Sequence, residues 1–446
     1  MTALAGWGRT APSVAVVRAA GEDDQLAEAV AGAPVRGVIA RGLGRSYGDP
    51  AQNGGGAVLD MTSRSRVLSV DVPSGRVLVE AGASLDHLMQ HLLPLGLMVP
   101  VSPGTRQVTV GGAVAADIHG KNHHAAGSFC DHVESLDLLT ADGVVRSVSR
   151  ESDPQLFWAT AGGMGLTGLV LRVLLRMSHV ESAHYVVDTE RARDLDDLMA
   201  RLEADDHRYP HSVAWIDCLA RGSALGRSVI TRGRSARVAE LPRSLQRAPL
   251  VFRPSTRLTV PDVCPPRLLN GLTVRAFNEL WFRKAPRRVR RDVQGLGQFF
   301  HPLDAVEDWN RIYGPRGFLQ YQFVVPFGEE QALRDVVRRL SDAGTASFLA
   351  VLKRFGTGNP GPLSFPAPGW TLALDIPVGG GLGELLDDLD RSVLDAGGRL
   401  YLAKDSRATA RTVHAMYPRV AEFRAVRDRV DPHRHFRSDL ARRLDL

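Results

Sequence analysis

The first third of the chain carries two glycine-rich stretches, RGLGRSYG at residues 41–48 and PGTRQVTVGG at residues 103–112. Each follows a short apolar segment that resembles a strand, residues 38–40 before the first and 97–99 before the second. Glycine permits a left-handed backbone and a close approach to a ligand. Bare main-chain N–H groups turned into one concavity suit a pyrophosphate. Two such loops closing on one diphosphate indicate a dinucleotide site, and no Rossmann pattern accompanies them.

Length and composition indicate an ordinary globular protein with more than one domain. The 446 residues exceed what a single core holds, so we expect two domains. Apolar residues make up 44% and charged residues 23%, as in typical globular chains. The net charge of +6 owes much to basic residues at 283–291. Such an excess suits nucleic acid, anionic lipid or a phosphate-bearing substrate, and equally a solvated arginine-rich face.

The sequence lacks the signals of a disulfide framework, a cysteine metal site, a secretory leader and a membrane span. The cysteines, Cys130, Cys218 and Cys264, are scattered without a CxxC pair, which predicts neither a disulfide framework nor a metal site. The first residues lack a basic region followed by an apolar run, so we expect no secretory signal. No window approaches the roughly 18 apolar residues of a membrane span, which leaves peripheral contact as the expected mode at a membrane.

The apolar pattern predicts strands and helices mixed along the whole chain. In the N-terminal third we expect a helix after a Ser84 N-cap and a hairpin around Asp142-Gly143. Between residues 247 and 292 the pattern breaks into prolines and arginines, which predicts a long mobile loop. The mixture favours sheets with helices packed on them. Predicted strands are 14–18, 77–79, 133–140, 144–149, 169–175, 212–217, 318–325, 347–352, 370–376 and 399–403; predicted helices are 23–31, 85–93, 329–342, 383–396 and 438–444.

Several motifs together resemble one family. They are RGLGRSYGD (41–49), PGTRQVTVGGAVAADIHGKNHH (103–124), GGMGLTG (162–168), FLQYQF (318–323), PGW (368–370), LYLAKDSR (400–407), MYPRV (416–420) and VDPHRHF (430–436). The chain resembles the FAD-linked oxidoreductases of the vanillyl-alcohol oxidase type. More narrowly, it is similar to the oxidoreductase subunits of the decaprenylphosphoryl-β-D-ribose 2′-epimerases.

This resemblance implies an α+β fold with two domains. A split FAD-binding domain would comprise residues 1–182 and 399–446. A substrate domain with an antiparallel sheet and helices would occupy residues 183–398, including the expected mobile loop at 247–292. The implied reaction oxidises the ribose 2′-hydroxyl of decaprenylphosphoryl-β-D-ribose to a ketone. That step is the first half of an epimerisation that supplies arabinan for the cell wall, and a separate short-chain reductase would complete it.

The resemblance also assigns FAD-binding positions. Related carbohydrate oxidases carry a flavin-bearing histidine where this chain has Arg45, and arginine cannot form that bond, so we expect dissociable, non-covalent FAD. The implied cofactor-binding residues are Ala40, Arg41, Gly42, Leu43, Gly44, Arg45, Ser46, Tyr47, Gly48, Asp49, Pro50, Gly104, Thr109, Val110, Gly111, Gly112, Ala116, Asp117, Ile118, His119, Val170 and Tyr401.

Four residues are candidates for catalysis. Lys404 would place an ammonium near the negative charge that gathers on reduced flavin; a salt bridge with Asp405 is the structural alternative. His119, Lys121 and Tyr47 are candidates for accepting the hydroxyl proton, although a lone histidine is more often structural. We predict no metal site, because no cluster at ligand spacing surrounds His123 and His124.

The substrate candidates lie in the inserted segment. Gln320 and Gln322, two residues apart on a predicted strand, share one face, and solvent exposure is the alternative reading. Lys353 would pair with the substrate phosphate as a point charge. Trp215, Phe355 and Thr371 would shape the pocket. Some relatives have Cys where this chain has Ala373, Tyr where it has Phe300, and Asn where it has Thr371.

Partners and location follow from the resemblance and the charge. A lipid-linked sugar phosphate is the expected substrate, and the basic 283–291 stretch would attract an anionic membrane surface. Relatives belong to the cell envelope, on its periplasmic face; the missing signal leaves the cytoplasmic face as an alternative. Competing functions are an aldonolactone or alditol oxidase that uses oxygen and, remotely, a basic nucleic-acid-binding protein. The aromatic content of 6% disfavours nucleic acid.

Overall fold

The computed structural model describes residues 1–253, 258–263, 269–345 and 347–446. Within these ranges the N-terminal third builds two small sheets, one ordered β1-β2-β4-β3 and the other β5-β6-β10-β8-β9. The first sheet pairs β2, β4 and β3 in parallel, and the second is antiparallel. Their strands are β1 (Thr2–Leu4), β2 (Ser13–Ala19), β3 (Val38–Arg41), β4 (Ala57–Asp60), β5 (Val67–Asp71), β6 (Arg76–Glu80), β8 (Val133–Leu139), β9 (Val145–Ser149) and β10 (Leu169–Arg176).

Local signals start and stop the elements of this part. The Ser84 hydroxyl caps its helix by accepting a hydrogen bond of 3.0 Å from the amide of His87. Gly143 takes a φ of 78° in the turn between β8 and β9, as the Asp-Gly pair predicts. The helices here are α1 (Asp23–Ala31), α2 (Leu85–Leu92), α3 (Val110–Ala115), α4 (His123–Ala126) and α5 (Pro154–Thr160).

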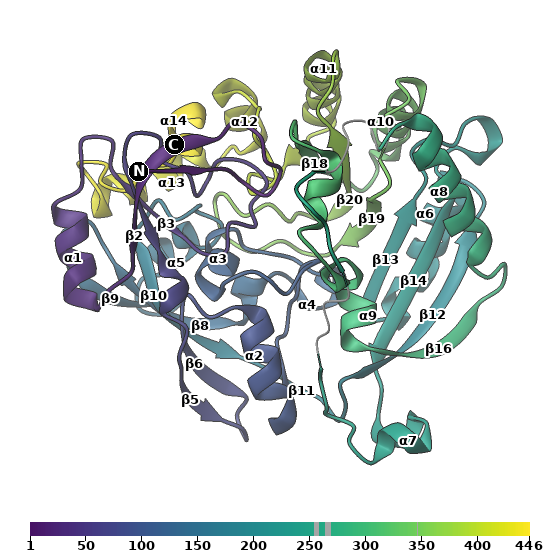
Figure 1. Ribbon diagram of the computed structural model, residues 1–446, viewed down its shortest axis with the longest axis horizontal. Helices are drawn as coiled ribbons and strands as arrows, with labels where there is room; N and C mark the ends of the chain where they lie inside the picture. Colours follow the sequence, from purple (N-terminus) through teal and green to yellow (C-terminus); the bar gives the residue numbers. More distant parts are fainter. Residues whose placement is uncertain (254–257, 264–268, 346) are drawn as a thin grey trace.

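The C-terminal segment packs against this N-terminal part. The amide of Val38 donates to the carbonyl of His435, and the amide of Arg437 donates back to Val38. Figure 1 shows the yellow C-terminal helices beside the purple N-terminal strands. These helices are α12 (Ala410–Met416), α13 (Val420–Val430) and α14 (Asp439–Leu444). Segments from the two ends of the chain therefore meet in one place.

A larger antiparallel sheet lies beside them, with the order β16-β12-β14-β13-β19-β20-β18-β21 in the described part of the chain (Figure 1). Its strands are β12 (His184–Ala192), β13 (His211–Ile216), β14 (Ser228–Ser235), β16 (Arg290–Gly295), β18 (Phe318–Pro326), β19 (Ala350–Phe355), β20 (Gly369–Pro377) and β21 (Arg399–Leu400). The associated helices include α6 (Leu195–Asp205), α8 (Gly271–Lys284), α9 (Leu296–Phe300), α10 (Glu330–Asp342) and α11 (Leu382–Asp395).

The register of this sheet gathers polar residues on one face. Gln320 lies directly opposite Asp375, Gln322 opposite Ala373, and Lys353 opposite Thr371. Side chains of directly opposed residues share a face, so the predicted substrate residues lie together. The alternate residues, including Leu372 and Leu374, are buried on the other face, against which α10 and α11 pack. One face is thus structural, and the other is left for a site.

Three sequence expectations for this region need correction. The proposed loop at 247–292 contains the helix α8, because the Asn270 side chain caps its first turn and no proline occurs until Pro286, past its end. The strand expected at 347–352 runs instead over β19, three residues later. The strand expected at 399–403 ends at Leu400, because the amides of Lys404 and Asp405 turn back to the carbonyl of Tyr401.

Other expectations concern cysteines and membranes. Cys130 and Cys218 are buried free thiols, and Cys264 lies outside the described residues. None of the described helices is both long and apolar enough to span a bilayer.

Candidate active site

The two glycine-rich stretches meet in space. The first follows β3, and a methyl group added at Gly42 would lie only 2.2 Å from the Thr109 hydroxyl oxygen of the second. Gly44 takes a φ of 65°, which a side chain would disfavour. The amide of Tyr47 donates to the carbonyl of Ala403, 3.0 Å away, so the C-terminal segment joins the same place. Three distant parts of the chain therefore meet in one region.

The first loop offers an unbroken run of bare amides. Those of residues 42–46 form no hydrogen bond with any described residue. In the second loop the expectation of bare amides fails at its end, where the amides of Val110 and Gly111 donate to the carbonyls of Ala83 and Ala81. The Gly112 amide donates to the Thr109 hydroxyl, which caps α3. The first loop therefore supplies consecutive donors suited to a phosphate, whereas residues 110–112 of the second use theirs within the fold.

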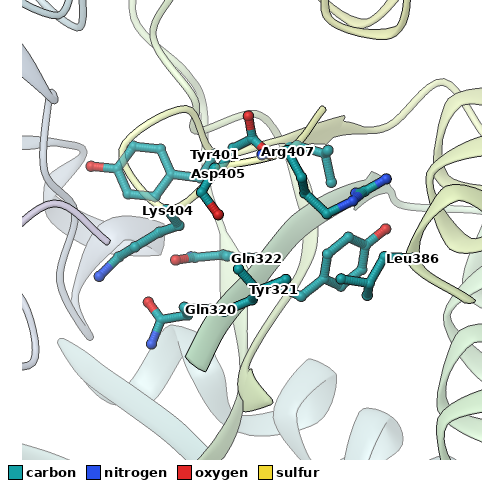
Figure 2. A pocket seen from close by; sticks show the side chains of 11 residues that line it. Gln320, Tyr321, Gln322, Leu386, Tyr401, Lys404, Asp405 and Arg407 are labelled. Carbon is teal, nitrogen blue, oxygen red and sulfur yellow. The ribbon is translucent and has the colours of Figure 1, made fainter. Parts of the chain in front are cut away.

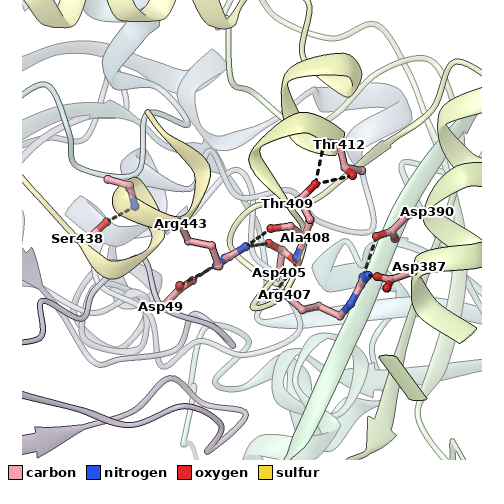
Figure 3. Close-up of polar contacts among 11 residues, drawn as sticks. Asp49, Asp387, Asp390, Asp405, Arg407, Ala408, Thr409, Thr412, Ser438 and Arg443 are labelled. Atoms are coloured by element: carbon pink, nitrogen blue, oxygen red, sulfur yellow. Dashed lines mark hydrogen bonds and ion pairs between the residues drawn. The ribbon is translucent and has the colours of Figure 1, made fainter. Parts of the chain in front are cut away.

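A partly buried arginine ties the first loop to the C-terminal segment. Arg443 donates to both carboxylate oxygens of Asp49, at 2.8 and 3.0 Å, and to Asp405 at 2.7 Å (Figure 3). The Tyr401 hydroxyl donates to the carbonyl of Ala116 at the end of α3, 2.8 Å away. The structural alternative of a Lys404–Asp405 salt bridge does not form among the described residues, where Asp405 pairs with Arg443. These contacts fix the strand-to-turn segment that carries Lys404.

Lys404 points at the first loop and not at solvent. Its ammonium lies 3.8 Å from the centroid of the Tyr47 ring, a cation–π contact. Burial lowers the pKa of Lys404, and the nearby carboxylate of Asp375 opposes that shift. Burial and the same carboxylate raise the pKa of Tyr47 well above its usual value, so this phenol keeps its proton at neutral pH.

Asp375 is a site residue that the sequence reasoning missed. It is fully buried on β20, where Gln320 donates an amide hydrogen to it at 2.5 Å and the Tyr313 hydroxyl lies 3.5 Å away. Burial raises its pKa, and Lys404 opposes the rise. The signal was available as a single acid in the apolar run Trp370–Pro377. A lone buried carboxyl among apolar residues is a functional-site signal.

His119 and Gln322 form the contact between the two parts of the site. Their side-chain nitrogens lie 2.9 Å apart, and the Gln322 amide nitrogen also lies 3.4 Å from the Thr371 hydroxyl. The Thr371 hydroxyl donates its proton to the carbonyl of Phe323, so its oxygen accepts from the Gln322 amide. Gln322 must then donate to Nε2 of His119, which places the imidazole proton on Nδ1.

The surroundings keep His119 neutral. Its ring packs edge-on against Phe355, with centroids 4.8 Å apart, and against Tyr401 at 5.1 Å. Burial, then the charge of Lys353, lowers its pKa well below the usual value. Nδ1 is buried without a partner among the described residues. An unpaired buried donor of this kind suits a ligand group.

Two further lysines belong to this region: Lys353 acts on His119, and Lys121 lies close enough to Lys353 to feel its charge. The ammonium of Lys121 donates to the carbonyl of Phe299 and lies 4.5 Å from that ring. Burial, assisted by the charge of Lys353, lowers the pKa of Lys121 to about 7. Burial alone lowers the pKa of Lys353 to about 8. Neither lysine forms an ion pair with a described residue, so the region attracts an anion.

Two remaining candidates lie further from this centre. Val170 is buried in β10, the strand against which α3 packs. Trp215 lies on the polar face of the large sheet, but its indole N–H donates to the carbonyl of Phe348, 3.0 Å away. The structure therefore groups the other substrate candidates around His119 and places Trp215 beside Phe348.

A cavity of about 280 Å³, which includes space open to solvent, adjoins this centre. In Figure 2 Gln320, Gln322 and Lys404 lie on one side of β18, with Tyr321 and Leu386 on the other. Among the described residues no group of three His, Cys, Asp or Glu side chains is placed to hold a metal ion. The free amides of 42–46, the buried Arg45 Nε without a partner and the unpaired His119 Nδ1 fit a dinucleotide with a polar ring system.

Comparison with known families defines the class. Residues 14–149 match the FAD binding domain family, and residues 383–444 match the D-arabinono-1,4-lactone oxidase family. The first match contains both glycine-rich loops, and the second contains Tyr401, Lys404 and Arg443. The protein is an FAD-dependent oxidoreductase.

Full-length relatives narrow the class. The chain is 51% identical to decaprenylphosphoryl-β-D-ribose oxidase of Mycolicibacterium smegmatis, over 99% of this chain and 97% of the relative. It is 28% identical to L-gulono-1,4-lactone dehydrogenase of Mycobacterium tuberculosis, over 97% and 96% of the two chains. A match to cytokinin dehydrogenase 2 of Arabidopsis thaliana covers 32% of this chain and 28% of the relative, at 29% identity. The chain belongs to the family of the decaprenylphosphoryl-β-D-ribose oxidases.

Proposed function

We propose that this protein uses FAD to oxidise the ribose 2′-hydroxyl of decaprenylphosphoryl-β-D-ribose to a ketone. The product would be the intermediate from which a second enzyme makes the arabinose epimer for cell-wall arabinan. The observation that carries the proposal is the pair Lys353 and Lys404 around a neutral His119, with Lys121 next in line beside Lys353. This cluster offers cations for a phosphate and polar groups for a sugar beside the FAD-binding loops.

FAD, when bound, supplies the acceptor for the hydride that leaves C2′. The free amides of residues 42–46 would hold its diphosphate, and Lys404, fixed over Tyr47, would stabilise negative charge on the ring system. Arg45 stacks on Trp7, with its guanidinium carbon 3.8 Å from the ring centroid. This arrangement supports dissociable FAD, because arginine occupies the place of the covalent histidine.

The hydroxyl proton needs an acceptor within the protein. Tyr47 keeps its proton because its pKa is raised, and the acceptor nitrogen of His119 is occupied by Gln322. Lys121, with a pKa of about 7, has a neutral amine in part of the population at neutral pH. These contacts favour Lys121 as the proton acceptor. His119 would instead donate its Nδ1 proton to a ligand oxygen, and Lys353 would pair with the phosphate.

Anaerobic mixing tests the function. The lipid-linked ribose is added to the oxidised holoenzyme while the flavin absorption band is followed. We expect the band to bleach with the substrate and to persist with the matching arabinose compound. Lys404→Met should keep FAD bound and bleach at least about a hundredfold more slowly, the order of loss seen when one charge-stabilising group is removed. An unbleached wild-type band would overturn the proposal.

The 383–444 match also supports a second candidate, oxidation of a free sugar lactone with oxygen as acceptor. Peroxide release distinguishes the two functions. The lactone oxidase would release peroxide with D-arabinono-1,4-lactone, whereas the favoured function predicts no turnover of that compound. The nucleic-acid-binding hypothesis is not retained, because the chain matches FAD-dependent oxidoreductases along its whole length.

Domain organisation and partners remain part of the proposal. We assign FAD binding to residues 1–182 and 399–446 and substrate binding to 183–398; the contacts of Tyr47 and Val38 with the C-terminal segment support the split. β21 adds a two-residue edge from the C-terminal segment to the large sheet, which links the units. A short-chain reductase would consume the ketone, and the envelope remains the expected location.

A further inference from the structure

Helix α8 exposes an apolar side. Its buried residues are Val274 and Asn278, one turn apart, and the opposite side turns outward. Leu272 is 79% exposed and Leu280 is 70% exposed; Phe277 and Trp281 are exposed at 41% and 44%. Figure 1 shows α8 at the outer edge of the molecule. Contiguous large apolar side chains at such exposure mark an interaction surface.

The end of the same helix is basic. Exposed Lys284, Arg287, Arg288 and Arg290 form no ion pair with any described residue. Arg283 pairs with Glu279, which also pairs with Arg227, so the one acid of α8 is neutralised. Leucine, phenylalanine and tryptophan beside unpaired lysine and arginine are typical of helices that lie in a bilayer interface.

A row of aromatic rings leads from this surface to the site. Phe277 lies 5.9 Å from Phe348, which stacks on Tyr313 at 5.9 Å between centroids. Tyr313 stacks on Phe318 at 4.0 Å. Phe318 meets Tyr47 edge-on at 5.4 Å, and the Tyr47 ring carries the Lys404 ammonium. The apolar surface of α8 is therefore joined to the residues around the reacting centre through packed, buried rings.

We infer that α8 docks on an anionic bilayer and that this contact brings the membrane-embedded substrate to the site at the other end of the row. The delivery of the substrate rests on the proposed function, whereas the docking surface stands on the exposed residues alone. Apolar insertion and charge attraction act together here. Each basic residue near an anionic surface contributes on the order of 1 kcal/mol.

Vesicle binding of the holoenzyme tests the surface. We expect binding to phosphatidylglycerol vesicles, weak binding to phosphatidylcholine vesicles, and weakening by salt. The pair Arg287→Gln and Arg288→Gln should lower the partition coefficient roughly thirtyfold, the equivalent of two such charges. Leu280→Asp should also abolish most binding. The controls Leu95→Asp, a 47% exposed leucine far along the chain, and Arg243→Gln with Arg247→Gln should bind like wild type. Unchanged binding by Leu280→Asp would overturn the inference.

Two substrates separate this inference from the proposed function. With a short-chain, water-soluble prenylphosphoryl ribose, Leu280→Asp should bleach the flavin as fast as wild type. With the long-chain substrate embedded in vesicles, it should bleach more slowly by about the factor lost in vesicle binding. If Leu280→Asp bleached as fast as wild type with both substrates, membrane docking through α8 would play no part in turnover. If wild type bleaches with neither while vesicle binding follows the expectations, the proposed function fails and the docking surface stands.

Discussion

A single buried carboxyl tunes the ammonium that the proposed chemistry needs. Asp375 opposes the burial that lowers the pKa of Lys404, and it is held by Gln320. Its removal as Asp375→Asn should therefore let the pKa of Lys404 fall further. Because Lys404 must be charged to stabilise reduced flavin, the alkaline limb of the pH–kcat profile should move to lower pH by about one unit or more.

Asp388→Asn, an exposed acid on α11, is the matched control and should leave the profile unchanged. FAD content, read from the visible spectrum, should remain that of wild type in both variants. An alkaline limb that stays in place in Asp375→Asn would remove the carboxyl from any positioning role.

The buried charge of Lys353 should destabilise the folded protein. Burial lowers its pKa from 10.5 to about 8, so between these pH values the unfolded chain binds more protons than the folded chain. The free energy of unfolding therefore rises as pH increases through that window. At neutral pH, Lys353→Met should stabilise the apoprotein by less than about 3 kcal/mol, since the partly exposed group is screened.

Denaturant unfolding at about pH 7 and about pH 10 measures this effect. As pH rises, the free energy of unfolding of wild type should increase relative to that of Lys353→Met. The same variant should bind the phosphorylated substrate more weakly. A Lys353→Met protein that is less stable at neutral pH would show that the lysine makes a net favourable contact in the fold.

Among single residues, sequence reasoning found those with a motif around them. His119, Gln322 and Lys404 lie in or next to recognisable runs, and the structure places them near one another. Asp375 has no motif, and its importance depends on Gln320, which strand pairing brings to it, and on Tyr313, which comes from the 3-10 helix Trp309–Tyr313. The engaged amides of Val110 and Gly111 were likewise invisible, because their acceptors lie at residues 81 and 83 in another element.

The backbone amides of the two loops differ in their hydrogen bonding. The first loop leaves its amides free, whereas α3 uses its own. FAD should therefore slow hydrogen exchange at residues 42–46 strongly. The amides of 110–112 should already be protected in the apoprotein.

Hydrogen exchange followed by mass spectrometry, with and without FAD, measures this difference. Residues 145–149 of β9 provide an internal control whose exchange should not respond. Fast exchange at 110–112 in the apoprotein, slowed only by FAD, would show that both loops act as amide cradles and that this assignment is wrong.

At the same scale, helix α8 shows why the loop expectation failed. Prolines and arginines on both sides of it dominate the composition of 247–292, and its own outward face is apolar. The usual pattern of a helix with a polar outer side was absent, so the periodicity did not stand out. Helices α1 and α2 were predictable because each has an apolar inner side and a clear end.

The whole molecule is joined across the site. Asp117 is fully buried and accepts from Ser128 and the amide of Cys130 in the N-terminal part. It also accepts from Asn359 and Ser364, which lie between β19 and β20. Gln322 and His119 make a second link. Separating the two parts would leave these buried groups unpaired, which is costly.

The molecule should consequently unfold as one unit. We expect a single calorimetric transition for the apoprotein, because independent melting would expose the Asp117 and His119 contacts in one half first. FAD at a hundred times its Kd should shift that whole transition, adding about 2.7 kcal/mol of stability. Asn359→Ala and Ser364→Ala together remove two donors to Asp117 and should split or broaden it. Two transitions in wild type, only one of them responding to FAD, would mean that the FAD-binding part is autonomous and that Asp117 does not join it to the large sheet.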